Sequence, residues 1–372
     1  MSRKILVTGG AGFIGSFIVD KLIEQGNDVR IFDSLEPQVH GDKMPDYLDP
    51  KAEFIRGDVN DAGALKDAVS DMDVVFHMAA LVGVGQSMYQ IKRYVEANTL
   101  GTSNLLDILV NSEHDVKKLV VASSMSTYGE GSYECENCGE VHPPLRPESQ
   151  MQKNDWELHC PVCDKHCKPI PTKESKTQEV NSIYAITKKD QEDMVLNIGK
   201  TYGIPSVALR FFNVYGPRQS LSNPYTGVAA IFMSRIKNAN PPIIFEDGNQ
   251  SRDFISVHDI ADANILAMKH QSADYEVFNV GTGNKISILE VAETISRLYK
   301  KSIMPKLAYK FRKGDVRHCF ADISKIRDKI GFDPKVSFSA GMGELIDWAG
   351  SVDAVDRVDD ATDELQKKGL LS

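Results

Sequence analysis

Apolar and polar positions in the first half of the chain follow two alternating periodicities. Short apolar runs with the composition of strands are each followed by a segment whose apolar residues recur at helical spacing. We expect strands at 4–7, 29–33, 53–56, 73–77 and 118–122, and helices at 13–25, 61–71 and 88–112. This β-α-β alternation predicts an α/β fold with a doubly wound parallel sheet that helices cover on both faces.

The alternation becomes irregular after about residue 213, which sets the predicted domain boundaries. We assign residues 1–213 to a first domain and residues 214–350 to a smaller C-terminal lobe, from which some segments return to the first domain. Ser287 and Glu290 have the pattern of a capping box, so a helix is expected to begin there. Residues 351–372 interleave acidic and apolar positions and predict a helical tail, with a frayed tail as the alternative.

The bulk composition narrows the classes of partner. The 372 residues are 42% hydrophobic and carry a net charge of −9, so neither nucleic acid nor a membrane surface finds electrostatic support. No run approaches the roughly 18 apolar residues of a membrane span, and the N-terminus lacks the pattern of a signal peptide. We therefore expect a cytoplasmic protein without a membrane partner.

A glycine-rich segment follows the first expected strand. Gly9, Gly12 and Gly15 allow a tight turn, a close approach to a pyrophosphate and helix-on-strand packing. The helix that begins near Phe13 directs its free N–H groups toward the phosphates. Asp33 ends the second strand, where a carboxylate suits the ribose hydroxyls of NAD and repels the 2′-phosphate of NADP. The pattern predicts a Rossmann-type dinucleotide-binding domain; a glycine turn in a non-binding α/β domain is the alternative.

Tyr184 and Lys188 lie one turn apart on the same face of an expected helix. A lysine held there keeps a positive charge near the phenol, lowers the tyrosine pKa and lets it act as a base near neutral pH. Ser124 follows the fifth strand, at the carboxyl edge where α/β sheets bind ligands. A nicotinamide beside such a base can move a hydride and a proton at a carbinol carbon.

Together these motifs resemble the extended short-chain dehydrogenase/reductase family, specifically its nucleotide-sugar epimerases and dehydratases. The resemblance runs from Arg3 to about Trp348. It implies that the catalytic residues are Ser124, Tyr184 and Lys188. It implies that NAD is bound by Gly9, Gly12, Phe13, Ile14, Gly15, Asp33, Asp58, Val59, Ala79, Ala80, Asn98, Tyr184 and Lys188. It implies that a nucleoside-diphosphate sugar is bound by Val82, Gln86, Ser124, Asn213, Arg252 and Arg312.

Several of these positions have an ordinary structural alternative. Arg252 and Arg312 would suit a substrate diphosphate, because the arginine fork matches phosphate oxygens, and surface salt bridges are the alternative. For Asn98 the alternative is packing between helices. For Val82, together with Val84 and Met88, it is a place in the apolar core.

The residues after Ser124 bear on the reaction that the resemblance implies. Relatives share oxidation at C4 of the sugar by bound NAD and differ in the next step. Dehydratases carry an Asp-Glu pair after the serine or threonine and decarboxylases a glutamate two places after it, whereas this chain has Met125 and Ser126. The resemblance therefore implies 4-epimerisation, in which the 4-keto sugar turns over and the hydride returns to its other face.

Three short sequence segments, which we call the branch segments, lie at 37–41, 85–89 and 222–227. Together with a cysteine-rich insert, they indicate one branch of the family. They resemble the branch that interconverts dTDP-L-rhamnose and dTDP-6-deoxy-L-talose. The alternatives are a UDP-hexose 4-epimerase, another NAD-dependent dehydratase or reductase, and a non-catalytic NAD-sensing protein. By analogy with relatives, we expect a homodimer formed through helices at 88–112 and 181–202.

An insert at 131–173 holds five of the six cysteines. Cys135-x-x-Cys138 and Cys160-x-x-Cys163 have the spacing of two zinc knuckles, so we expect a zinc ribbon around a structural Zn²⁺. His166 and Cys167 are competing ligands, and four reduced, unligated cysteines are the alternative. Seven acidic and five basic residues between 132 and 173 argue against nucleic acid as the ribbon's partner.

Overall fold

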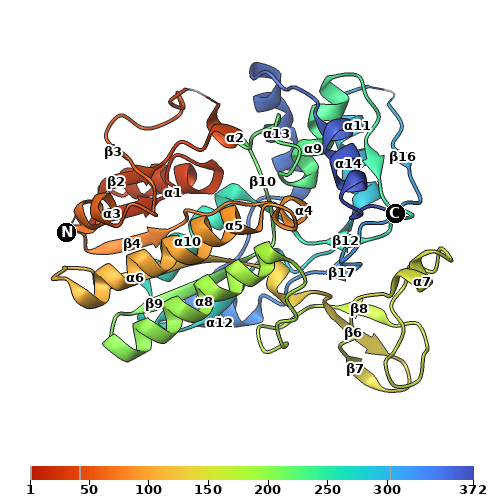
Figure 1. Ribbon diagram of the computed structural model, residues 1–372, viewed down its shortest axis with the longest axis horizontal. Helices are drawn as coiled ribbons and strands as arrows, with labels where there is room; N and C mark the ends of the chain where they lie inside the picture. Colours follow the sequence, from red (N-terminus) through yellow and green to blue (C-terminus); the bar gives the residue numbers. More distant parts are fainter. Residues whose placement is uncertain (1, 42, 302) are drawn as a thin grey trace.

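The computed structural model describes residues 2–41, 43–301 and 303–372. Its central sheet has seven strands, all parallel, in the order β14-β9-β5-β4-β1-β2-β3 (Figure 1). The strands are β1 (Lys4–Thr8), β2 (Asp28–Asp33), β3 (Glu53–Arg56), β4 (Val74–His77), β5 (Lys118–Ser124), β9 (Ser206–Phe211) and β14 (Val277–Val280). All five strands expected from the sequence are present, and the doubly wound α/β fold is confirmed.

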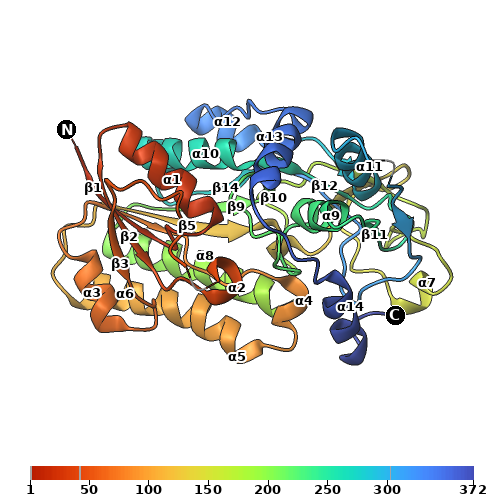
Figure 2. The ribbon, with the colours of Figure 1, turned by 90° about the horizontal axis from the view of Figure 1, so that it is seen from above.

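Helices cover both faces of this sheet (Figure 2). One face carries α1 (Phe13–Glu24), α10 (Val257–Lys269) and α12 (Ser324–Ile330). The other face carries α3 (Ala62–Val69), α5 (Ile91–Tyr94), α6 (Gly101–Asn111) and α8 (Ile183–Tyr202). Strands buried on both sides need apolar residues at successive positions, which is why Ile5, Leu6 and Val7 are all fully buried.

The strand order places the reversal of the chain beside β1. From β1 the chain proceeds through β2 to β3 at one edge, and from β4 through β5 and β9 to β14 at the other. Ligands of such sheets bind outside the carboxyl ends of the strands at this reversal. The glycine loop follows β1, residues 78–82 follow β4, and Ser124 ends β5. Three of the expected motifs therefore lie along one edge of the sheet.

The helix expected at 88–112 differs from the structure. It begins at Ile91, after the short helix α4 (Val84–Ser87), and Val95–Leu100 form a π-helix between α5 and α6. Apolar spacing alone does not distinguish a π-turn from an α-turn, although a π-turn re-aims the side chains around it. Here the π-helix contains Asn98, whose fully buried side chain reaches the segment after β4.

The C-terminal half forms a smaller lobe with a core of its own. Its helices are α9 (Val228–Lys237), α11 (Ile288–Leu298) and α13 (Phe338–Ser351), and the capping box of Ser287 and Glu290 opens α11 as expected. Its short strands are β10 (Asn213–Tyr215), β11 (Ile243–Ile244), β12 (Ser251–Arg252), β13 (Phe254–Ser256), β15 (Ile286–Ser287), β16 (Lys306–Leu307) and β17 (His318–Cys319). From the same half of the chain, β14, α10 and α12 pack in the first lobe.

The cysteine-rich insert forms a three-stranded sheet in the order β7-β6-β8. Its elements are β6 (Ser132–Cys135), β7 (Gly139–Val141), α7 (Glu148–Met151) and β8 (Lys168–Ile170). In Figure 1 it projects at the lower right of the molecule. Backbone hydrogen bonds from Gly131 to His318 and from Thr172 to Phe320 attach its two ends beside β17. The insert therefore docks against the second lobe.

The chain ends in a helix that lies between the lobes. α14 (Val358–Lys367) buries Ala361 and Leu365, and the last residues then pair with residues 311–313 through backbone hydrogen bonds. The remaining short helices are α2 (Pro37–His40), η2 (Met125–Tyr128) and η3 (Gln271–Ala273). None of the helices in the described part of the chain combines the length and apolar character needed to cross a membrane.

Candidate active site

The glycine loop is packed too tightly for side chains. Gly9 has φ +68° and donates its N–H to Phe32 O at 2.9 Å. A Cβ on Gly9 would lie 2.8 Å from the backbone nitrogen of Ala79, and a Cβ on Gly15 would lie 2.2 Å from Gly9 O. The turn therefore brings the end of β1 against the segment after β4, and α1 begins at Phe13 directly beyond Gly12. Its first N–H groups face the loop, as a phosphate site requires.

Asp33 joins this loop to the end of β2. Its carboxylate is buried and accepts hydrogen bonds from the backbone N–H of Ala11 at 3.0 Å and of Leu35 at 2.8 Å. Each carboxylate oxygen can accept a second hydrogen bond, so the position suits ribose hydroxyls. Asp58 stands farther along the same edge and is exposed, while Val59 is buried against α6 and Gly101. The expected cofactor residues of the first three strands thus share one edge.

Asn98 positions the segment that follows β4. Its amide accepts from Leu81 N at 2.7 Å, and donates to Leu81 O at 3.1 Å and to Thr187 Oγ1 at 3.0 Å. These three bonds tie residues 79–82, including Ala79 and Ala80, to α8. Asn98 therefore holds this loop against α8, which fits the alternative of packing between helices, and its role in binding the cofactor stays a prediction.

Ser124 and Tyr184 face each other across the carboxyl edge. Ser124 ends β5, caps η2 and accepts from Ser126 N at 3.1 Å and from Ser126 Oγ at 3.0 Å. Tyr184 stands in the first turn of α8, which Ser182 caps. Burial raises the pKa of Tyr184 to about 12, and interaction with the Ser124 hydroxyl works against that rise. The hydroxyls of Ser124 and Tyr184 are thus two neighbouring polar groups that could bind a substrate oxygen.

Lys188 is buried one turn beyond Tyr184. Its Nζ donates to Ala122 O at 2.8 Å, and burial lowers the lysine pKa to about 7. The expectation that Lys188 lowers the Tyr184 pKa stays a prediction. Desolvation dominates both groups: it disfavours the phenolate of Tyr184 and the ammonium of Lys188. His77, buried between Thr8 and Thr102, has its pKa lowered by the same cause to about 3.

The three branch segments, at 37–41, 85–89 and 222–227, contact one another in the folded chain. Gln38, in the first segment, exchanges two hydrogen bonds with the amide of Gln86 in the second, at 3.2 and 3.1 Å. Gln38 also donates to Asn223 in the third segment at 3.0 Å. Tyr94 also donates to Gln86. Gln86 is therefore a buried node of this network, and sequence reasoning assigned no role to Gln38 or Asn223.

Exposed apolar residues lie next to this node. Val82, Val84 and Met88 are 56%, 45% and 40% exposed, so the alternative that they belong to the core is wrong. Ser87, in the same segment, accepts from Tyr184 N at 3.0 Å through its side-chain oxygen. The segment from 82 to 88 thus presents apolar side chains outward, while the Ser87 side chain contacts the backbone of Tyr184.

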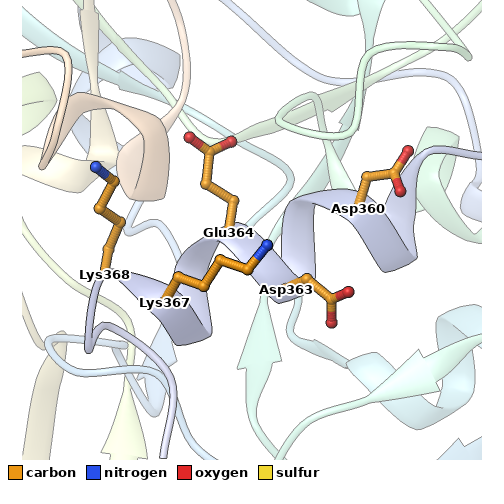
Figure 3. A pocket seen from close by; sticks show the side chains of 5 residues that line it. All are labelled: Asp360, Asp363, Glu364, Lys367 and Lys368. Carbon is orange, nitrogen blue, oxygen red and sulfur yellow. The ribbon is translucent and has the colours of Figure 1, made fainter.

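The terminal helix α14 adds a polar cluster to the same region. Tyr89 donates to Tyr225 at 2.6 Å, and Tyr225 donates to Glu364 of α14 at 3.2 Å. Lys368 lies over the ring of Tyr89 at 5.8 Å. Figure 3 shows Glu364 and Lys368 pointing to the same side of the helix. The charged hollow drawn there is lined by Asp360, Asp363, Glu364, Lys367 and Lys368. No pattern in the sequence indicates that these residues approach residues 85–89.

Asn213 begins β10, and Arg252 ends β12, the strand that precedes β13, the partner of β10. Asn213 N donates to Asp253 O at 2.9 Å, and Asn213 Oδ1 is buried without a hydrogen-bond partner among the described residues. Arg252 donates to backbone oxygens of Ser251 and Arg317 at 2.9 and 3.0 Å, and also to Val316 O. The half-buried Arg252 is therefore no surface salt bridge, which leaves the diphosphate role open to it.

Arg312 stands on the loop beyond, where it pairs with Asp315 at 2.9 Å and lies over the ring of Phe245. The alternative of a surface ion pair fits Arg312 as the structure has it. Asn181, just before α8, donates to Gly314 O at 2.7 Å. This bond holds the Arg312 loop next to the start of the Tyr184 helix.

Cys135, Cys138, Cys160 and Cys163 come together in the insert. Their sulfur atoms all lie within 4.8 Å of one another, with Cys135 Sγ and Cys163 Sγ 3.5 Å apart. Backbone N–H groups, that of Asn137 foremost, lower the pKa of the Cys135 thiol to about 6. Cys167 is buried nearby but stands outside this set of four. Four converging sulfurs with a stabilised thiolate match the donor set of a tetrahedral zinc site.

Comparison with known proteins gives consistent matches along the chain. The model of the NAD dependent epimerase/dehydratase family matches residues 5–150 and 162–281, and the gap falls in the insert. The dTDP-L-rhamnose 4-epimerase of Burkholderia thailandensis is 36% identical over 352 residues, covering 93% of this chain and 94% of its own. Two solved UDP-glucose 4-epimerases are similar in structure. The enzyme of Thermotoga maritima with UDP-glucose has a TM-score of 0.76 at 30% sequence identity, and the match covers 94% of this chain and 99% of that one. The enzyme of Thermus thermophilus in complex with NAD has a TM-score of 0.74 at 27% sequence identity, and the match covers 94% of this chain and all of that one.

Proposed function

This chain belongs to the NAD dependent epimerase/dehydratase family, and on that premise we propose that it is a nucleotide-sugar 4-epimerase that interconverts dTDP-L-rhamnose and dTDP-6-deoxy-L-talose. The observation that carries the reaction is the placement of Ser124, Tyr184 and Lys188 at the carboxyl edge beside the glycine loop. Met125 and Ser126 follow Ser124, so the carboxylate that elimination or decarboxylation would use there is replaced.

The protein groups have distinct tasks in this reaction. Bound NAD would accept a hydride from C4 of the sugar and return it to the opposite face. Tyr184 removes the proton of the C4 hydroxyl and later restores it, while Ser124 donates a hydrogen bond to the same oxygen. Lys188 supplies positive charge on the tyrosine side of the site. Asp33 and the glycine loop hold the adenosine and pyrophosphate parts of the cofactor.

Three observations support the sugar. The Burkholderia relative is named for dTDP-L-rhamnose. The branch segments at 37–41, 85–89 and 222–227 form one hydrogen-bonded cluster at the expected sugar end of the site. Val82 and Met88 offer exposed apolar surface, which suits a C6 methyl group. We place the diphosphate at Asn213 and Arg252, with Arg312 on the neighbouring loop.

The test is NMR of purified protein with dTDP-L-rhamnose, following the H4 coupling pattern of the sugar. We expect a 6-deoxy-talose spin system to grow without net formation of NADH. Tyr184→Phe should lower turnover by about 10²- to 10⁴-fold, the usual contribution of a general acid–base. Tyr202→Phe, in the last turn of the same helix and 53% exposed, is the matched control and should leave turnover unchanged.

Other outcomes point to the alternatives. Turnover of UDP-hexoses with none of dTDP-L-rhamnose would replace the substrate by that of the Thermotoga relative. Release of NADH would indicate a net oxidoreductase. No turnover of any nucleotide sugar, with NAD still bound, would favour a sensing protein.

The insert is assigned a structural zinc ion in this proposal. Cys135, Cys138, Cys160 and Cys163 supply four sulfurs, and four thiolates leave no open position for catalysis. The small cluster of apolar residues around Tyr133 and Leu158 makes a limited core, so metal binding would supply much of the insert's folding energy.

The assembly in this proposal is a homodimer in the cytoplasm. Ile91, Val95 and Leu100 are 50%, 40% and 45% exposed on the helical segment from α5 to α6, and Ile186 is 40% exposed on the adjacent α8. Apolar residues gathered on neighbouring helices favour contact with another protein surface. A second copy meeting this one through α5, α6 and α8 agrees with the dimer expected from the family resemblance.

A further inference from the structure

The insert contains a second group of metal-binding side chains, separate from the four cysteines. Asp155, His159 and His166 each offer a ligand atom, and these atoms all lie within 4.8 Å of one another. Asp155 Oδ2 is 3.0 Å from His159 Nε2, and Asp155 Oδ1 is 3.9 Å from His166 Nε2. Imidazole and carboxylate groups converging in this way form a common donor set for transition-metal ions.

The backbone holds the two histidines side by side. Cys160 N donates to Lys165 O at 2.7 Å and Cys167 N donates to Leu158 O at 2.8 Å. His159 and His166 are therefore the non-hydrogen-bonded pair between these two bonds, the arrangement that brings cross-strand side chains closest. Their ring centroids are 4.6 Å apart. Successive side chains in a strand point to opposite faces, so the histidines lie on the face opposite to buried Cys160 and Cys167.

The hydrogen bonding of His159 leaves its Nε2 directed at this group. Its Nδ1 lies 3.2 Å from the carboxylate of Asp164, so this ring nitrogen is already held by a carboxylate and Nε2 is the ring nitrogen that faces Asp155. Nε2 is shielded from solvent and lacks a hydrogen-bond partner among the described residues, although Asp155 Oδ2 is only 3.0 Å away. The direction of that contact is thus not that of an N–H···O bond. A carboxylate holding the far nitrogen of a histidine is the usual support of a metal ligand.

The separation of Asp155 and His159 already suits one shared ion, and that of Asp155 and His166 is somewhat longer. Ligand atoms about 2.1 Å from a zinc ion lie about 3.0 to 3.4 Å apart for bond angles between about 90° and 109°. The 3.0 Å contact of Asp155 and His159 is within this range. His166 must approach by roughly half an ångström, which its 64% exposed side chain permits by rotation. We propose that Asp155, His159 and His166 bind a second divalent transition-metal ion, with Asp164 supporting His159 and solvent completing the coordination.

The probe is Zn²⁺ at buffered free concentrations, added to the full-length protein, with bound zinc counted by mass spectrometry of the metal. Wild type should bind one zinc per chain more than either His159→Gln or His166→Gln. Asp164→Asn should weaken this additional zinc by about 10- to 100-fold, the usual effect of losing a carboxylate that supports a ligand. His142→Gln is the matched control, because His142 lies in the same insert, partly exposed and 3.9 Å from Glu140. It should bind as much zinc as wild type.

Equal zinc content in wild type and both histidine variants over the whole range of free zinc would overturn the proposal. The absorbance of cobalt bound to thiolates shows in every variant whether the cysteine cluster is intact. Where a histidine variant loses that absorbance, Asp155→Asn, which lies outside the hairpin, takes its place in the comparison. The readout is a difference in metal content, so its failure is distinct from failure of the epimerase reaction.

Discussion

At the scale of single residues, the pair of Tyr184 and Lys188 shows how burial opposes the chemistry that the sequence implies. Lys188 is 3% exposed, donates to one backbone carbonyl, and has a pKa lowered to about 7. A buried ammonium is destabilising unless it is paired, and functional sites often retain such groups at a cost in stability. The lysine is therefore expected to be a source of instability as well as a catalytic group.

The prediction at this scale is that Lys188→Met stabilises the cofactor-free protein at pH 6 by about 1–3 kcal/mol and abolishes turnover. The lysine pKa is about 7 in the folded protein, against the ordinary value of 10.5 that an unfolded chain would have. Between those values the unfolded chain binds the proton that the folded chain lacks, so this group makes stability rise with pH. Below pH 7 the buried charge of Lys188 lowers the free energy of unfolding by its full amount. By about pH 10 this loss of stability has largely gone.

Denaturant unfolding at pH 6 and at pH 9 would measure this difference. Lys189→Met is the control, because Lys189 is partly exposed, next in sequence and paired with Asp193. It should change the free energy of unfolding by less than about 0.5 kcal/mol at both values of pH. A Lys188→Met variant that loses stability equally at pH 6 and pH 9 would contradict the assignment of the penalty to the buried charge.

At the scale of elements, α14 connects parts of the site that are far apart in sequence. Arg235 pairs with Asp356 and Asp359 and holds the start of the tail on α9. Leu365, 7% exposed, lies where a Cβ on Gly85 would be 3.3 Å from its methyl group. The last residues pair with the loop that carries Arg312. The tail thus links α4, the expected sugar end of the site, to the loop expected at the diphosphate.

We predict that Leu365→Ala raises KM for the nucleotide sugar several-fold more than it lowers kcat. Removing a buried leucine side chain costs about 2–5 kcal/mol where it packs, and an element at the end of the chain releases this cost by opening locally. Hydrogen exchange should therefore quicken in α14 and α4 while the global unfolding transition changes little. Lys367→Ala, on the exposed side of the same helix, is the control. Equal exchange in Leu365→Ala and wild type would show that α14 does not brace α4.

At the scale of the whole molecule, buried charges join the insert to the second lobe. Arg317, fully buried, pairs with Glu157 of the insert at 2.6 Å and with Glu246 and Asp247 of the second lobe at 2.8 and 2.7 Å. Arg146 of the insert pairs with Glu246 at 2.8 Å. Removing one partner of a buried ion pair is far more costly than the pair is stabilising. The folded state of the insert is therefore coupled to that of the lobe.

Removal of zinc is accordingly expected to destabilise the protein beyond the insert. After verified metal loss with a strong chelator, scanning calorimetry should show the main transition lowered by more than about 5 °C. Addition of excess zinc to the same sample is the control and should restore the transition. An unchanged transition in the metal-free protein would show that the cysteine cluster does not stabilise the fold.

The sequence by itself determined the central sheet, the glycine loop and the placing of Tyr184 and Lys188 one turn apart on a helix. Each feature follows from a short stretch of sequence. The strands are continuous apolar runs, the glycines stand where side chains would clash, and Tyr184 is four residues before Lys188. Such patterns report backbone conformation and chemical type within about one or two turns. They were also sufficient to give the family, and through it the expected reaction.

The tertiary structure decided which distant residues meet. It brought Gln38, Gln86 and Asn223 together, set Glu364 against Tyr225, and placed Asp155 beside two histidines. Burial in the folded chain also raises the Tyr184 pKa. The physical reason is that burial and neighbouring charge depend on distances between residues far apart in the chain, and no local period of apolar or polar residues encodes those distances.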